Sequence, residues 1–300
     1  MQFQTLTKEI KLTQSNGKIS TVNLTNFKKE EVPKEKINLN PYELFNQGLI
    51  LEKSIPTKEV INLINFIRYN YEPVELIRIG SVGDGGYLFP DIFKEVNYCF
   101  SPGVSNIASF EEDLAKKYNI KSFLADASVD SPPVKNNNFQ FTKKFLGAQS
   151  NERYITLSNW IELAEQQEND NLFLQMDIEG FELDVLIKED MKTLSKFAGM
   201  IIEFHWLDKI FHRYSFKMFN AIFSKIIEDF CIVHIHPNNC CGLATYDSVT
   251  IPRVAEFSFL RRDFLDKVKR LNKISIPNKL DHPNVKKNQD IILPNIWWKN

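Results

Sequence analysis

The residues with the clearest chemical potential follow a short apolar run near the middle of the chain. Residues 172–176 read Leu-Phe-Leu-Gln-Met and predict a buried strand, which Asp177 and Glu179 follow directly. Gly180 permits a turn there. Two carboxylates at this spacing can act on one ligand or one metal ion. The alternative is a helix N-terminus that merely favours acidic residues.

Histidines stand at the ends of the next two predicted strands. Strand alternation places Glu203 and His205 on one face, and it places His234 and His236 together in the same way. Imidazoles beside carboxylates can supply a general base near neutral pH, or N and O ligands for Mg²⁺ or Mn²⁺. Histidines with a purely structural role are the alternative.

A tight turn follows the strand predicted at residues 96–100. Gly103 can take a positive φ or allow close backbone approach, and Ser105 or Asn106 can cap the next helix. A free helix N-terminus attracts a carboxylate or phosphate, although a plain strand-turn-helix needs no ligand. Asp126 lies about 23 residues after Gly103, near the spacing of an acid that binds the ribose of a nucleoside cofactor. An aspartate that only forms a turn is the alternative.

Four glycines fall within seven residues at positions 80–86. Such a loop exposes its backbone and could close over a ligand, or it could simply join an edge hairpin to the first helix. No Lys-Ser or Lys-Thr pair follows, so the loop is not a phosphate-binding P-loop.

Strand-like runs alternate with helical patterns from residue 57 onward. Apolar spacing predicts a helix over 57–69. Near-continuous apolar strands favour a mainly parallel sheet covered on both faces, and the loop between the last two favours an antiparallel pair at one edge. Such sheets bind ligands at the carboxyl ends of their strands, where the residues above lie. The runs are 96–100, 122–125, 139–141, 172–176, 200–204, 231–235 and 255–260.

The composition is that of an ordinary globular protein. With 43% hydrophobic and 25% charged residues the chain is not mainly disordered, and a net charge of −1 gives no global attraction to nucleic acid or anionic membrane. No apolar run is long enough to cross a bilayer, and the N-terminus lacks a signal-peptide core. The four cysteines show no CxxC spacing. We therefore expect a cytoplasmic protein with no nucleic-acid partner and no membrane span.

Several of these segments together resemble the FkbM-type methyltransferases, which use S-adenosylmethionine. The similarity covers about residues 76–295, and its most specific part is the D-I-E-G motif with its preceding apolar strand. The main segments are R-I-G-S-V-G-D-G-G-Y-L (78–88), S-P-G-V-S-N-I-A-S-F-E (101–111), L-Q-M-D-I-E-G-F-E (174–182) and I-I-E-F-H (201–205).

The resemblance implies an α/β, Rossmann-like class I methyltransferase fold. Its sheet would have seven strands, mostly parallel with an antiparallel last strand, and helices on both faces. We expect an N-terminal extension over residues 1–70 and a catalytic domain over 71–300. The implied reaction is methyl transfer to a hydroxyl of a sugar or nucleotide-linked sugar, in polysaccharide or natural-product biosynthesis.

The resemblance also assigns binding roles by position. The implied cofactor-binding residues are Asp84, Gly85, Gly86, Tyr87, Ser101, Gly103, Ser105, Asn106, Asp126 and Asp177. The implied substrate-binding residues are Glu179, Trp206, His236 and Asn238.

Two mechanisms for removing the acceptor's hydroxyl proton stay open. In the first, His205 is the base, and Glu203 or Asp177 orients it. In the second, Mg²⁺ or Mn²⁺ bound by Asp177, Glu203 and His236 lowers the pKa of the hydroxyl.

Two other functions are alternatives to methyl transfer. A nicotinamide-dependent oxidoreductase shares the ribose-binding acid but requires a G-x-G-x-x-G motif, which is absent. A non-catalytic nucleotide-binding protein would keep the fold without transfer, and the intact D-I-E-G and E-F-H residues argue against it. A homo-oligomer is also open, because residues 1–45 could pack on a second subunit.

Overall fold

The computed structural model describes residues 9–13, 19–23, 40–48, 52–164 and 171–299. The chain divides into two compact units, Met1–Lys53 and Ser54–Asn300. In the first unit, β1 (Glu9–Thr13) pairs antiparallel with β2 (Ile19–Asn23), and α1 (Pro41–Asn46) begins at the capping residue Asn40. The second unit contains all the predicted site residues.

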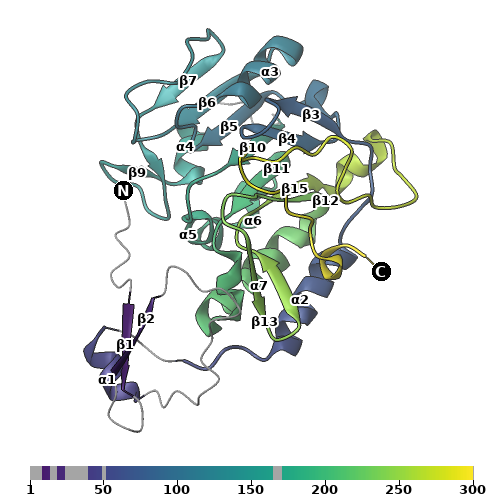
Figure 1. Cartoon of the computed structure of the whole chain (residues 1–300). Coiled ribbons are helices and arrows are strands. Elements are labelled where there is room, and N and C mark those ends of the chain that lie inside the picture. Colours follow the sequence, from purple (N-terminus) through teal and green to yellow (C-terminus); the bar gives the residue numbers. More distant parts are fainter. Residues whose placement is uncertain (1–8, 14–18, 24–39, 49–51, 165–170, 300) are drawn as a thin grey trace. The chain divides into compact units, whose positions relative to one another are not determined.

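The second unit is built around a seven-stranded sheet (Figure 1). Its strand order is β12-β15-β11-β10-β5-β6-β7, and every neighbouring pair is parallel except those that β15 makes with β11 and β12. The predicted fold class is therefore confirmed. The strands are β5 (Tyr98–Pro102), β6 (Lys121–Ala125), β7 (Phe139–Thr142), β10 (Leu172–Met176), β11 (Phe197–Phe204), β12 (Phe230–Pro237) and β15 (Ala255–Arg261).

Helices form where apolar residues recur on one face. In the second unit, α2 (Thr57–Tyr69) buries a stripe that includes Val60, Ile64 and Ile67, and it coincides with the helix predicted over 57–69. The others are α3 (Ser109–Tyr118), α4 (Leu157–Leu163), α5 (Glu182–Lys188), α6 (Met191–Leu194) and α7 (Arg213–Asp229), with 3-10 helices η1 (Phe93–Glu95), η2 (Leu207–Phe211), η3 (Arg262–Lys267) and η4 (Asn295–Trp297).

Apolar cores cover both faces of the sheet. Leu172 and Leu174 of β10 join the core formed with α2, α4, α5 and α7, whereas Phe173 points to the opposite core. That second core contains α3, η1 and a hairpin of β3 (Ile77–Gly80) and β4 (Gly86–Phe89). The remaining short strands are β8 (Phe145–Leu146), β9 (Tyr154–Ile155), β13 (Leu243–Tyr246) and β14 (Val249–Pro252).

Strand register aligns three ionisable residues across the sheet. Glu203 of β11 lies opposite Glu256 of β15, which lies opposite His236 of β12. The C-terminal segment (residues 268–299), yellow in Figure 1, runs over this region, where Asp281 contacts β12 and Asn284 contacts Glu256. None of the helices in the described part of the chain has the length and apolar character needed to span a bilayer.

Candidate active site

A cavity of about 240 Å³ lies where β5 and β10 end. Three segments of the chain form most of its wall: the β3–β4 hairpin loop, the turn after β5 and the turn after β10. Eight predicted site residues line it: Asp84, Gly85, Tyr87, Gly103, Ser105, Asn106, Asp177 and Glu179. The turns after β5 and β10 therefore meet at one cavity, as predicted, whereas the residues predicted after β6, β11 and β12 do not line it.

Gly103 allows the two turns to meet. Its φ is +86°, and a Cβ atom there would overlap the carbonyl oxygen of Asp177. The Gly103 N–H donates to the Ala125 carbonyl (2.9 Å), which fixes the turn over β6. A glycine is thus required here by close backbone approach between the cavity walls.

Asp126 supports the wall from behind. Its Oδ2 accepts the Ser105 N–H (2.9 Å), and its Oδ1 accepts the Ser128 N–H (2.7 Å). The residue is buried and is not part of the cavity lining. Its observed contacts are those of a turn-forming aspartate, and ribose binding stays a prediction.

The hairpin loop is held by Arg78. The guanidinium donates from Nε to the Ser81 carbonyl and from Nη2 to the Gly83 carbonyl, both at 2.8 Å. A Cβ at Gly86 would overlap the Ser81 carbonyl oxygen, so Gly86 shapes the loop without lining the cavity.

A buried polar network forms the floor of the cavity. The Ser101 hydroxyl contacts Glu111 Oε1 and Gln175 Oε1, and Gln175 Nε2 donates to the Tyr87 hydroxyl (2.9 Å). Burial raises the pKa of Glu111 to about 7, so its protonated form can itself donate to Ser101. Ser101 lies beneath the lining, whereas Glu111 and Gln175 line the cavity and were not predicted, although both fall within the segments that resemble the family.

Carboxylates surround the His205 imidazole. Nδ1 lies 3.1 Å from Glu182 Oε1, and Nε2 lies 3.5 Å from Glu179 Oε2 and 3.8 Å from Asp177 Oδ1. Although burial disfavours the charged imidazolium, the hydrogen bond and charge of Glu182, with the other two carboxylates, raise the pKa of His205 to about 9. An imidazole already protonated at neutral pH cannot accept another proton, so these contacts do not favour His205 as the predicted base.

Glu182 orients His205, a role predicted for Glu203 or Asp177. Besides facing the imidazole, Glu182 Oε1 accepts the N–H groups of Ile178 (3.2 Å) and Gly180 (3.1 Å). The buried side chain thus folds back over the D-I-E-G turn that precedes it. The only sequence signal was its place at the end of L-Q-M-D-I-E-G-F-E.

Asp177 presents a carboxylate to the cavity. Its Oδ1 has no hydrogen-bond partner among the described residues, and its side chain is partly exposed. Burial raises the pKa of Asp177 to about 7, against the opposing charge of His205. A proton acceptor is most effective when its pKa lies near the working pH, so Asp177 suits that role better than His205.

Glu203, Asn238 and Trp206 lie outside the cavity lining. Buried Glu203 accepts a hydrogen bond from Asn238 Nδ2 (2.8 Å), and burial, with the charges of Asp177 and Glu256, raises the pKa of Glu203 well above its usual value. Trp206 is half-exposed beside the D-I-E-G turn, where Lys209 Nζ lies 3.4 Å from its ring centroid.

The structure does not form the predicted metal set of Asp177, Glu203 and His236. Asp177 and Glu203 instead group with His205, and His236 groups with His234 and Asp281; in each group the ligand atoms lie within 4.8 Å of one another. The first group fits a metal poorly, because burial favours a protonated Glu203 and the carboxylates favour a protonated His205.

The strand order, the antiparallel β15 and the cavity at the strand ends define a Rossmann-like class I methyltransferase fold. Residues 56–228 match the family described as the methyltransferase FkbM domain. The match covers more than half of the chain, and the chain belongs to this family. Membership implies S-adenosylmethionine as the methyl donor.

Two solved structures show distant similarity to this chain. One is the fibrillarin/Nop5p complex, with 11% sequence identity and a TM-score of 0.33. The match covers 56% of this chain and 73% of that chain. The other is precorrin-6y C5,15-methyltransferase from Geobacter metallireducens GS-15, with 9% sequence identity and a TM-score of 0.28. The match covers 70% of this chain and 93% of that chain. The comparison with curated proteins gives no match.

Proposed function

We propose that the protein is an O-methyltransferase that acts on a hydroxyl of a sugar, either free or nucleotide-linked. The observation that carries the proposal is the cavity in which Asp177 faces the turn of Gly103. The methyl donor and the acceptor hydroxyl would meet at this carboxylate.

The charge of the cavity suits S-adenosylmethionine. Asp84, Glu111, Asp177 and Glu179 contribute carboxyl groups, and none of the described residues that line the cavity is Lys or Arg. A sulfonium nucleoside is positively charged, whereas the pyrophosphate of a nicotinamide cofactor is negatively charged. Electrostatic complementarity therefore favours the sulfonium, which the Gly103–Asn106 turn and the hairpin loop would hold.

The chain must orient the acceptor and remove its proton. When bound, S-adenosylmethionine supplies an electrophilic methyl group. Asp177 would accept the hydroxyl proton, a contribution of roughly 10²- to 10⁴-fold in rate. The charged His205 would keep Asp177 oriented, since its Nε2 lies 3.8 Å from Asp177 Oδ1.

The rim beside Asp177 supports a sugar as the acceptor. Glu179 lines the cavity with a largely exposed side chain that can accept hydrogen bonds from sugar hydroxyls.

Labelled S-adenosylmethionine, incubated with the protein and a panel of free, nucleotide-linked and lipid-linked sugars, tests the proposal. We expect a mass gain of one methyl group on an oxygen of one sugar class. A panel of amines and thiols serves as the matched comparison. Transfer to those acceptors and to no sugar would contradict the proposal.

A further inference from the structure

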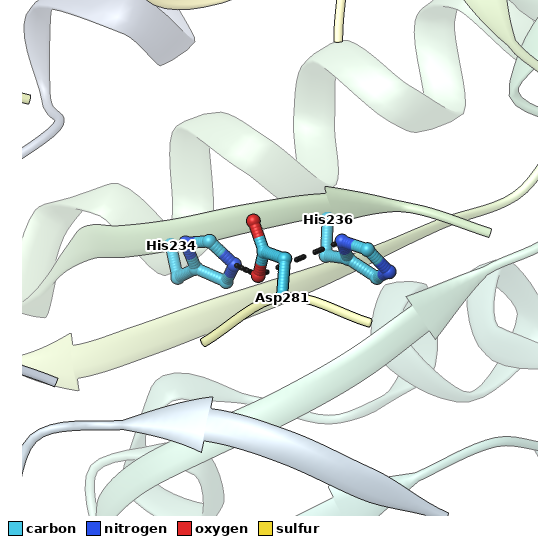
Figure 2. Close-up of side chains that lie close together, drawn as sticks. All are labelled: His234, His236 and Asp281. Carbon is cyan, nitrogen blue, oxygen red and sulfur yellow. Dashed lines mark hydrogen bonds and ion pairs between the residues drawn. The ribbon is translucent and has the colours of Figure 1, made fainter. Parts of the chain in front are cut away.

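A second cluster of histidine and carboxylate side chains lies away from the cavity lining. His234 and His236 point to the same face of β12, and Asp281 reaches them from the C-terminal segment. Figure 2 shows the Asp281 carboxylate between the two imidazoles. Asp281 Oδ1 lies 2.8 Å from His234 Nε2 and 3.7 Å from His236 Nδ1.

The cluster is deeply buried and incompletely hydrogen-bonded. The side chains of His234, His236 and Asp281 are only 3%, 8% and 5% exposed. His234 Nδ1 and His236 Nε2 have no hydrogen-bond partner among the described residues. These two nitrogens are not the ones nearest Asp281; the convergent nitrogens are His234 Nε2, which is hydrogen-bonded to Asp281 Oδ1, and His236 Nδ1. Each buried polar atom without a partner costs roughly 1–3 kcal/mol, so apolar side chains would be more stable here if packing were the whole role. The residue types therefore indicate a purpose beyond packing.

The three convergent atoms have the spacing of metal ligands. Tetrahedral zinc with bonds of about 2.0–2.1 Å places its ligand atoms about 3.3 Å apart. The two separations from Asp281 Oδ1 lie on either side of that value, and all three ligand atoms lie within 4.8 Å of one another. Two imidazoles and one carboxylate are a common ligand set for zinc and for other divalent transition metals.

The carboxylate is already oriented for this role. Asp281 Oδ2 accepts the Asn278 N–H (2.7 Å), so the turn of the C-terminal segment directs Oδ1 toward the histidines. Hydrogen bonds of this kind, made by the atom of a ligand that does not face the metal, fix the geometry of metal sites.

We propose that His234, His236 and Asp281 bind one divalent transition metal ion, with zinc the best-fitting ion. The site is structural, because none of the three residues lines the cavity. It would join the C-terminal segment to the edge strand β12. The effect would extend to the cavity wall, because the adjacent Leu280 carbonyl accepts a hydrogen bond from Arg78 (3.3 Å), the residue that holds the hairpin loop.

The test uses the full chain freed of any affinity tag and stripped with a chelator. Zinc is titrated by calorimetry, and the bound metal is counted by mass spectrometry. We expect one zinc per chain and a higher thermal midpoint with zinc. His236→Gln and Asp281→Asn should each weaken binding at least about 10-fold, while His212→Gln, which changes an exposed histidine elsewhere, should leave it unchanged.

Cobalt spectroscopy of the wild-type chain keeps the test decisive if the variants unfold. We expect visible bands of four- or five-coordinate cobalt without a thiolate charge-transfer band. A thiolate band would place the metal at Cys240 and Cys241 and would overturn the proposal. So would a folded wild-type chain that takes up no zinc, or equal affinity in the wild type and a folded His236→Gln variant. Since no arm measures methyl transfer, the result is independent of the proposed function.

Discussion

Two clusters built from the same residue types behave differently in this molecule. At the cavity, three carboxylates surround the single imidazole of His205. In the cluster on β12, one carboxylate, Asp281, lies between the two imidazoles of His234 and His236. The His205 and His236 side chains are both largely buried, 12% and 8% exposed, so burial alone cannot account for the difference.

The pKa values of His205 and His236 shift in opposite directions. Burial disfavours the charged form of His205, but Glu182, Asp177 and Glu179 together raise its pKa to about 9. Burial also disfavours the charged form of His236. Asp281 and Asp290 oppose that effect, His234 and Arg78 add to it, and the pKa of His236 is lowered. Whether a buried histidine carries a charge therefore depends on the charged groups that face it as well as on burial.

Removing the Asp177 carboxylate should have the largest effect on the rate of methyl transfer. Asp177→Asn should lower kcat roughly 10²- to 10⁴-fold, because it removes the proposed proton acceptor while keeping the shape of the side chain. Steady-state rates measure the loss, and calorimetry with S-adenosylhomocysteine checks that the cofactor still binds. Asp266→Asn, whose side chain is 97% exposed, is the matched control. An unchanged kcat in Asp177→Asn would remove Asp177 from the mechanism.

Glu111 extends the comparison to a buried carboxyl with no histidine beside it. Its pKa is about 7 in the folded protein against 4.5 ordinarily, so the folded state holds this proton more tightly than the unfolded state. Its contribution to stability is complete below pH 4.5 and is lost as the pH rises through about 7.

Glu111→Gln should remove this pH-dependent contribution to the free energy of unfolding. The free energy of unfolding of the wild type, relative to the variant, should fall by on the order of 3 kcal/mol between about pH 4 and pH 8. Urea unfolding of both proteins across this range measures the difference, and the other buried carboxyls cancel because both proteins contain them. Parallel pH profiles would show that Glu111 titrates normally.

Glu182→Gln should have a smaller effect, and it tests whether the surrounding carboxylates raise the pKa of His205. Losing one of three carboxylates should move the pKa of His205 from about 9 toward 6.5. The stability that His205 contributes is complete below pH 6.5 and is lost as the pH rises through about 9, so the variant should lose it at lower pH. NMR titration of the imidazole signals measures the shift, with exposed His212 as an internal reference. An unshifted His205 would contradict the electrostatic explanation.

Much of the cavity could be predicted from local sequence. The strand-like runs, the glycine at position 103 and the carboxylates after residue 176 each carry a short-range signal. In a parallel sheet the strand ends meet at one edge, so these signals suffice to place the residues together. The strands of the main sheet were predictable from their short apolar runs, and the antiparallel final strand from the loop, without a helical pattern, between the last two runs.

The contacts that decide charge were not predictable in this way. Glu182 reaches His205 because its side chain folds back over its own turn. Asp281 lies far along the chain, outside any helix or strand. Glu256 meets Glu203 and His236 only because β15 inserts between β11 and β12. Such pairings depend on register and on tertiary packing, which periodicity does not encode.

The central claim is that the cavity beside Gly103 and Asp177 binds the methyl donor. Calorimetric titration with S-adenosylhomocysteine tests it most directly in two variants. Ile107→Trp places a large ring in the cavity wall, and Ile187→Trp places the same ring on α5; the original residues are 44% and 45% exposed. We predict at least a roughly 10-fold loss of affinity for Ile107→Trp and wild-type affinity for Ile187→Trp. Equal, wild-type affinity in both variants would contradict the claim.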